Sequence, residues 1–333
     1  MILDAALLVA GLVLLIVSAD QFVLGASRVA HVWDVPPVVV GAVVMGFGTS
    51  APELVVSATA ASQGDLALGV GNVIGSNVAN LSLVLAAAAL TSRLVISPTT
   101  MRREAPLSIA ATVAFALAVW DGKLTTLEGG LLAAGLVVVI GFLLTVGVVE
   151  GDLEESDEVQ LSGGRELGRV VLGLLGTVLA ARLVVDGSTG LAEAWDLTGG
   201  FVGFSLVAVG TSLPELVTTL AAARRKETGL IVGNLLGSNV FNSLAVGAGM
   251  GLLGAGAIGD DSLVGTGVVV MLIVAVVSFV LASFGLRLGR WDGVALLAIY
   301  VAAMLLLIGD AEADEDDGDA IGVAAPIVRI HDG

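Results

Sequence analysis

The chain of 333 residues contains no cysteine, only two histidines and only two lysines. Without cysteine it has no disulfide bonds, thiolate metal sites or cysteine nucleophiles. We expect His31 in a loop and His331 in the C-terminal tail, away from any buried chemistry. Neither a serine–histidine pair nor a pair of membrane-embedded aspartates is visible. The sequence therefore predicts no enzyme and no cofactor.

Positive charge is also scarce, with 14 basic residues against 31 acidic ones and a net charge of −17. The acids gather in "EGDLEESDE" at 150–158 and "DAEADEDDGD" at 310–319. We interpret these runs as solvated acidic surface; a mouth that attracts cations is the alternative. Nucleic acid is not an expected partner of so acidic a chain.

Hydrophobic residues, by contrast, make up 56% of the chain, and the mean hydropathy is +1.02. Apolar runs of about 18 residues or more recur along the whole length, which is typical of transmembrane helices. A membrane β-barrel would instead show short alternating segments. The pattern predicts an all-α polytopic membrane protein with ten transmembrane helices, at 2–19, 36–61, 67–91, 104–120, 127–149, 168–186, 198–223, 229–255, 263–285 and 292–309.

The basic residues indicate the orientation of these helices, because arginine and lysine favour cytoplasmic loops. With the N-terminus outside, 11 of the 14 basic residues fall in cytoplasmic segments. Only Lys123 and Arg329 then lie outside. We therefore expect a multi-pass protein of the cell membrane with both termini outside.

Two motifs occur twice, each time 162 residues apart. "GTSAPE" at 48–53 recurs as "GTSLPE" at 210–215, and "GNVIGSNVAN" at 71–80 recurs as "GNLLGSNVFN" at 233–242. Each half holds five predicted helices, an odd number, so the halves should cross the membrane in opposite senses. Such inverted repeats place a substrate site at mid-membrane. The expected organisation is a first five-helix repeat (1–149), a short acidic cytoplasmic linker (150–167), a second repeat (168–309) and an acidic, disordered tail (310–333).

An ionisable residue within a membrane helix is costly and indicates function. Glu53 shares one helix face with Ser50 and Thr49, which precede it by three and four positions. Pro52 lacks an N–H and displaces the carbonyl of Gly48, so the motif predicts a kinked helix with a cluster of oxygen atoms. The second motif repeats the pattern around Glu215.

The other motif places polar residues at every fourth position, which makes a stripe along one helix face. The stripes consist of Asn72, Ser76 and Asn80, and of Asn234, Ser238 and Asn242. For Asn77 and Asn239, packing or hydrogen bonding between helices is the favoured interpretation. Two carboxylates among many neutral oxygens, without nitrogen or sulfur ligands, suit a hard cation such as Ca²⁺ or the similarly sized Na⁺.

The twin motifs resemble the alpha repeats of the sodium/calcium exchanger family of cation/Ca²⁺ antiporters, and the ten-helix plan covers almost the whole chain. The resemblance implies a secondary antiporter that exchanges Ca²⁺ for Na⁺ in the lipid bilayer, and we expect a monomer. It implies eight helices around the ions, with the first and sixth helices sliding past them to alternate access.

The resemblance also implies an ion-binding set, carried over by position. The first half supplies Thr49, Ser50, Glu53, Ser76, Asn80 and a backbone oxygen at Gly46; the second supplies Thr211, Ser212, Glu215, Ser238, Asn242 and a backbone oxygen at Ala208. Thr49, Thr211 and the two glutamates match the central Ca²⁺ ligands. Asn242 departs from prokaryotic relatives with Asp there, which leaves the counter-ion open: Ca²⁺/H⁺ or other cation/proton antiport is the alternative, and a passive channel is a more distant one.

Overall fold

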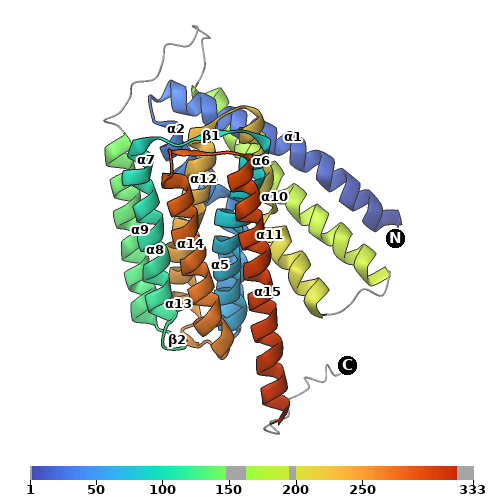
Figure 1. Ribbon diagram of the computed structural model, residues 1–333. Coiled ribbons are helices and arrows are strands. Elements are labelled where there is room, and N and C mark those ends of the chain that lie inside the picture. Colours follow the sequence, from blue (N-terminus) through green and yellow to red (C-terminus); the bar gives the residue numbers. More distant parts are fainter. Residues whose placement is uncertain (1, 148–162, 195–199, 321–333) are drawn as a thin grey trace.

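The computed structural model describes residues 2–147, 163–194 and 200–320 and shows a bundle of helices with short strand pairs at its two ends (Figure 1). Within those residues, seven helices are long and apolar enough to cross a membrane. Pro37–Thr49 and Ala51–Ser62 form an eighth crossing if this bent pair counts as one span. The predicted class, a polytopic helical membrane protein, is therefore confirmed.

The first half of the chain contains helices in five successive stretches of sequence, three of which hold more than one element. They are α1 (Ile2–Val32); α2 (Pro37–Val40), the π-helix η1 (Gly41–Gly46), α3 (Phe47–Thr49) and α4 (Ala51–Ser62); α5 (Leu66–Ala79), η2 (Asn80–Val84) and α6 (Leu85–Thr91); α7 (Pro98–Arg102) and α8 (Glu104–Val119); and α9 (Thr126–Gly147). The short strands β1 (Leu94–Val95) and β2 (Lys123–Leu124) lie between the later stretches.

The second half follows a similar order. Its helices are α10 (Gly163–Ala194); α11 (Gly200–Arg224); α12 (Thr228–Val240), η3 (Phe241–Val246) and α13 (Gly247–Leu253); η4 (Leu263–Gly267) and α14 (Val268–Ser283); and α15 (Arg290–Ala320). The strands are β3 (Gly256–Ala257) and β4 (Arg287–Leu288). The π-helices η2 and η3 begin within one residue of equivalent positions, close to Asn80 and Asn242. Single π-turns within helices are frequently found at functional sites.

Three helices extend beyond their predicted ends. Helix α1 continues past Ala19 to Val32 and includes His31, because no proline interrupts it before Pro36. Helix α10 begins at Gly163, inside the predicted linker. Helix α15 continues to Ala320, so the predicted disorder from residue 310 is wrong up to that point. The acidic segment there has no proline to stop the helix, although its five aspartates favour a helix less than alanine does. Residues 321–333 of the predicted tail lie outside the described residues.

The predicted kink occurs in the first half only. The axes of the helices on either side of Ser50 differ by 44°, and Ser50 itself has φ −87° and ψ 8°. Helix α11 instead runs unbroken past Pro214, so the expectation of a matching break in the second half is wrong. Pro52 lies at the start of α4, where its missing N–H has no helical partner to lose.

The strands pair across the two halves, which the sequence did not predict. β1 pairs with β4, and β2 pairs with β3, both antiparallel. The register matches Leu94 with Leu288 in the first pair and Gly256 with Leu124 in the second. Leu94 and Gly256 are 162 residues apart, and Leu124 and Leu288 are 164 apart, so the two strand pairs correspond with an offset that is two residues larger in the second case. The two pairs cap opposite ends of the bundle (Figure 1).

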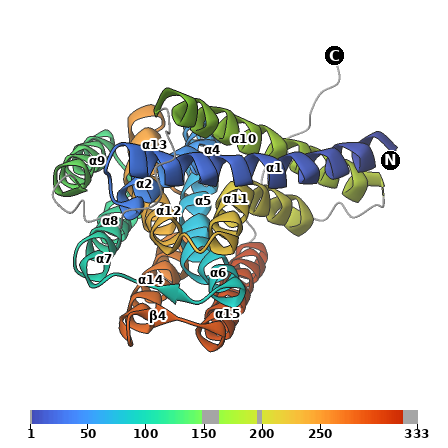
Figure 2. The same ribbon diagram turned by 90° about the horizontal axis from the view of Figure 1, so that it is seen from above.

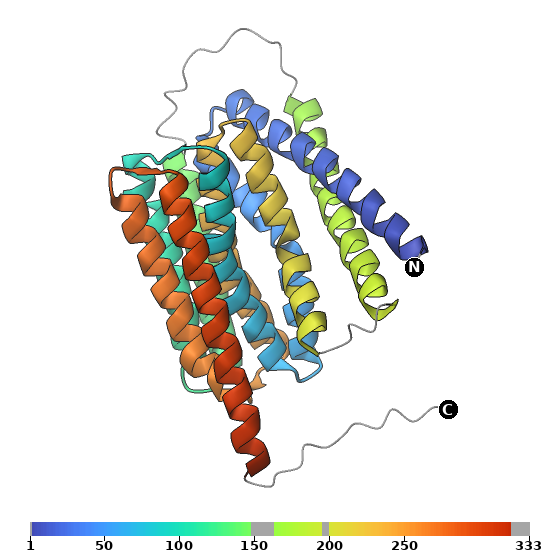
Figure 3. The ribbon, with the colours of Figure 1, turned by 45° about the vertical axis from the view of Figure 1, so that its right-hand side comes forward.

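Helices α1 and α10 pack along each other on one side of the bundle and are inclined to the other helices (Figure 3). Glycine allows the close approach: a Cβ at Gly11 would lie 2.9 Å from the backbone nitrogen of Val184, and one at Gly173 would lie 2.6 Å from that of Phe22. These two contacts are equivalent, because both residues shift by 162. The pair is thus packed symmetrically.

Hydrogen bonds and ion pairs connect the C-terminal half of α1 to other parts of the chain. Asp20 accepts hydrogen bonds of 2.7 and 2.8 Å from Nη2 of Arg225, and Ser27 donates one of 2.6 Å to Glu227. Arg28 forms an ion pair of 3.3 Å with the buried Glu166 of α10. Asp20, which directly follows the predicted first span, is therefore an ion-pair partner within a longer helix.

Candidate ion-binding site

Both repeated glutamates lie deep inside the bundle. Glu53 is in the first turn of α4, directly after the bend at Ser50, and Glu215 follows Pro214 within α11. Each is only 1% exposed. Helix α11 contacts α3, the element that directly precedes the bend, so the motifs of the two halves meet inside the bundle.

A hydrogen bond joins the two motifs directly. The hydroxyl of Ser50 donates to Oε1 of Glu215 across 2.8 Å. Ser50 precedes Glu53 by three residues, and both border the same bend. The bend thereby turns the serine hydroxyl of one half toward the carboxylate of the other.

Several polar atoms of this region are buried without a hydrogen-bond partner among the described residues. They are both carboxylate oxygens of Glu53, Oε2 of Glu215, Oδ1 of Asn80, and both side-chain polar atoms of Asn242. Leaving a buried polar atom without a partner costs about 1–3 kcal/mol, and more for a charged group. Most of these atoms are oxygens, which are the ligand atoms that Ca²⁺ and Na⁺ prefer. A bound cation would therefore supply the missing partner.

The backbone oxygen of Gly46 also lies at the contact between the halves. It accepts a hydrogen bond of 3.2 Å from the hydroxyl of Ser238 on α12. A Cβ at Gly46 would lie 2.7 Å from the backbone nitrogen of Ser238, so only glycine permits this approach. Thr49, one turn further on, is fully buried; its hydroxyl donates to the Met45 carbonyl at 2.9 Å.

Asparagines link the helices around the glutamates. Asn77 donates to the hydroxyl of Ser243 at 2.9 Å, and Asn239 donates to the backbone oxygen of Asn77 at 3.4 Å. The interpretation of both asparagines as interhelical hydrogen-bonding groups is thus confirmed. Asn80 donates to Oδ1 of Asn239 at 3.0 Å, which leaves its own amide oxygen available.

Two hydroxyl residues that the sequence analysis did not identify, Ser57 and Thr219, accept hydrogen bonds from the polar stripes. Asn72 donates to Ser57 at 2.9 Å, and Asn234 donates to Thr219 at 3.1 Å. Asn72 and Asn234 are 162 residues apart, and so are Ser57 and Thr219. Adding the repeat offset to Ser57 would therefore have identified Thr219 from the sequence. Asn234 also lies 3.4 Å from the hydroxyl of Thr49 and so connects the second stripe to the first motif.

The remaining predicted ligands are placed as follows. Ser76 on α5 and Ser212 on α11 are buried. Thr211 and Ala208 fall within α11, but their contacts lie outside the described part of the chain. In that part, no three His, Cys, Asp or Glu side chains cluster, so the charged ligands of the candidate site are the two glutamates alone.

Comparison with known proteins gives consistent matches. The model of the sodium/calcium exchanger protein family matches residues 3–145 and 166–309. The sodium/calcium exchanger MaX1 of Methanosarcina acetivorans is 30% identical over 351 residues, covering 90% of this chain and 97% of that protein. An uncharacterized membrane protein of Methanocaldococcus jannaschii is 33% identical over 310 residues, covering 92% and 99%. A structure of the sodium–calcium exchanger NCX_Mj soaked with Na⁺ and Sr²⁺ superposes with a TM-score of 0.82 at 31% identity, covering 92% of this chain and 98% of that one.

Proposed function

Since this chain belongs to the sodium/calcium exchanger family and is a cation/Ca²⁺ antiporter, we propose that it exchanges Ca²⁺ for Na⁺ by alternating access. The observation that carries this proposal is the pair of buried glutamates, one from each half, whose oxygens mostly lack protein partners. The proposed ligands are the twelve residues carried over from the family motifs. Both halves of one chain complete the site, so a monomer suffices.

The charge of the site suits Ca²⁺. Two carboxylates balance one divalent cation, and hydroxyl, amide and backbone oxygens complete the six to eight ligands that Ca²⁺ takes. No basic side chain has a recorded ion pair or hydrogen bond with Glu53 or Glu215 among the described residues. Water cannot easily screen charge at this depth, so the ion itself is the natural counter-charge.

We also propose that the chain consists of two inverted five-helix repeats that together cross the membrane ten times, with both termini outside. Strand β1 pairs with β4 in the same way as β3 pairs with β2, which supports an internal two-fold relation between the halves. The paired contacts of Asn72 and Asn234 support the same relation. Under this proposal α8 and α11 cross the membrane as well as the helices counted above.

Helices α1 and α10 are the proposed moving pair. They pack on each other and lie beside the bundle (Figures 2 and 3). Their symmetric glycine contacts at Gly11 and Gly173 hold them together as one unit. Sliding of this unit would alternately expose the glutamates to the two sides of the membrane.

The experiment that tests the function is ⁴⁵Ca²⁺ uptake into proteoliposomes loaded with Na⁺, K⁺ or acid. Uptake driven by internal Na⁺ and unaffected by a proton ionophore is the expected result. Uptake that requires the acid-loaded interior would establish the alternative, Ca²⁺/H⁺ antiport, for which the same two carboxylates would carry the protons. Uptake that depends on no counter-ion would contradict antiport altogether.

A further inference from the structure

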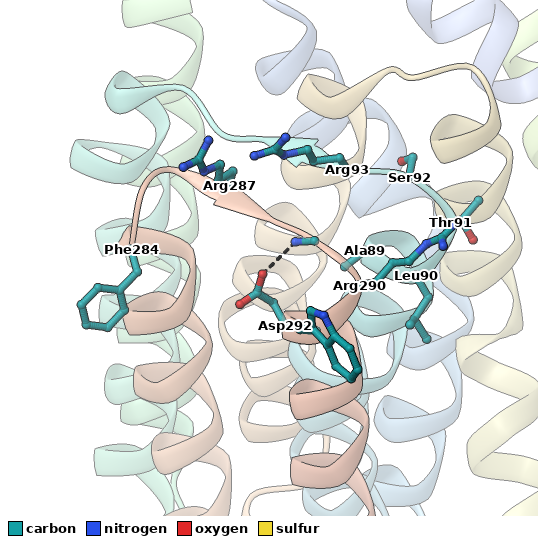
Figure 4. Close-up of a pocket in the computed structure, with 11 residues that line it drawn as sticks. Ala89, Leu90, Thr91, Ser92, Arg93, Phe284, Arg287, Arg290 and Asp292 are labelled. Atoms are coloured by element: carbon teal, nitrogen blue, oxygen red, sulfur yellow. Dashed lines mark hydrogen bonds between the residues drawn. The ribbon is translucent and has the colours of Figure 1, made fainter.

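A cavity of about 630 Å³ lies away from the ion site, where the end of α6 meets the start of α15 (Figure 4). Three arginines line it: Arg93 before β1, Arg287 in β4, and Arg290 at the start of α15. Arg93 and Arg287 come from neighbouring paired strands and lie side by side (Figure 4). Three positive side chains from two distant sequence segments thus line one cavity.

These arginines have no side-chain partner in the described part of the chain. No ion pair or hydrogen bond of their side chains occurs among the described residues, and all three are exposed. The acid in the cavity wall, Asp292, instead accepts a hydrogen bond of 2.8 Å from the backbone nitrogen of Gly289. Asp292 therefore serves the start of α15 and leaves the positive charge of the cavity available to a ligand.

The opposite end of the bundle shows that the fold does not need these arginines. There the strand pair β2–β3 repeats the same register, and Glu128 accepts a hydrogen bond of 2.7 Å from the backbone nitrogen of Thr125 as Asp292 does from Gly289. By the strand register and the starts of α9 and α15, the positions that correspond to Arg93, Arg287 and Arg290 are Ala255, Lys123 and Thr126. Strand pairing and helix capping are thus achieved with one lysine in place of three arginines.

The surroundings of the cavity are those of a membrane surface. Trp291 and Phe284 in its wall are 85% and 74% exposed, and aromatic residues gather where a bilayer meets water. Below them, α14 and α15 present exposed apolar side chains such as Val280 and Leu297. A ligand in the cavity would therefore have its polar group beside the arginines and its apolar part along these helices.

We propose that this arginine cavity binds the phosphate of an anionic membrane phospholipid. Arginine forms paired hydrogen bonds with phosphate oxygens, and basic pockets between transmembrane helices bind anionic head groups. The acyl chains would lie along the exposed faces of α14 and α15. The site is independent of the ion site, so its failure would leave the proposed exchange untouched.

Native mass spectrometry of the full chain in detergent tests the proposal, with equal amounts of phosphatidylglycerol and phosphatidylcholine added. Wild type should retain phosphatidylglycerol preferentially, and the R93Q/R287Q/R290Q variant should bind it about 100-fold more weakly, because each basic residue near an anionic membrane surface contributes about 1 kcal/mol. The matched control R102Q/R224Q/K226Q removes three charges from other cytoplasmic segments and should bind as wild type does.

Equal retention of the two lipids by wild type would overturn the proposal, as would an equal loss in the control variant, which would show a general charge effect. Displacement of the lipid by glycerophosphate at matching concentration would also overturn it, since the site would then hold a soluble phosphate. If the triple variant does not fold, R290Q alone decides. It should lose about fivefold in phosphatidylglycerol affinity, and unchanged affinity would refute the site.

Discussion

Ser50 and Glu215 are 165 positions apart in the chain, and the serine hydroxyl donates a 2.8 Å hydrogen bond to the carboxylate. The bond crosses between the two halves, beside the bend that positions Glu53. It therefore joins the two motifs, and the proposed shared ion site depends on that contact.

Replacing Ser50 with alanine should weaken Ca²⁺ binding. A hydrogen bond to a charged group contributes about 1.5–3 kcal/mol, so the Ca²⁺ concentration for half-maximal ⁴⁵Ca²⁺ uptake should rise about 10- to 100-fold. Ser82→Ala is the matched control, because the buried Ser82 hydroxyl bonds, among the described residues, only to Val78 in its own helical segment. Equal half-maximal concentrations for wild type and Ser50→Ala would remove Ser50 from the site.

Asn242 offers two buried side-chain atoms without partners in the described chain. Asn242→Asp should retain exchange but make it more dependent on pH, because a third titratable carboxylate joins Glu53 and Glu215. The comparison is Na⁺-dependent Ca²⁺ flux against pH for both proteins. Superimposable profiles, or wild-type behaviour of Asn242→Ala, would mean that Asn242 does not contact the ions.

The ion pair between Asp20 and Arg225 should resist movement of α1. Its partners are 46% and 30% exposed, and such pairs contribute about 0–1 kcal/mol, so breaking it should change the exchange rate by up to about fivefold. Asp20→Asn, Arg225→Gln and the double variant should change the rate equally, because each removes the same contact. Arg224→Gln, one residue away, is the control. Additive effects of the two single substitutions would show that the pair does not act as a latch.

The inverted repeat predicts opposite locations for two equivalent loops. Gln63 follows α4 and Lys226 follows α11. Because the chain has no cysteine, a single cysteine at either position can be labelled selectively with an impermeant thiol reagent. Cysteine at 63 should react from outside the cell and cysteine at 226 only after access to the cytoplasm. Reaction of both from one side would refute the proposed topology.

The two motifs could be predicted because each consists of a few consecutive residues that repeat at a constant offset. Glu53 and Glu215 each stand out as acids in apolar segments behind a proline, and the constant offset relates them. The helix ends were harder to predict. Asp20 marks the end of an apolar run in sequence, yet it lies within α1, where Arg225, 205 positions away, pairs with it.

The strand pairs and the single kink depend on contacts between the halves. Two-residue strands such as β1 have no periodic signal, and their pairing with β4 depends on where the helices bring the loops. Pro52 and Pro214 have the same neighbours in sequence, but the helix breaks only before Pro52. Proline determines which backbone hydrogen bond is lost, and the surrounding packing determines how far the helix bends.

The central claim is that Glu53 and Glu215 hold one Ca²⁺ between the two halves. Na⁺-driven ⁴⁵Ca²⁺ uptake into proteoliposomes, measured for wild type, Glu53→Gln and Glu215→Gln, tests it most directly. Removing one charged partner of a buried pair costs about 3–5 kcal/mol, so each substitution should lower uptake by about 100-fold or more. Asp261→Asn, an exposed acid outside the site, is the control and should leave uptake unchanged.

Both glutamine variants should elute from gel filtration as wild type does, because glutamine preserves the size of the side chain. Loss of uptake in both folded variants is the result that the account predicts. Wild-type uptake in either one would contradict it, because a site that works with one carboxylate is not shared between the two halves.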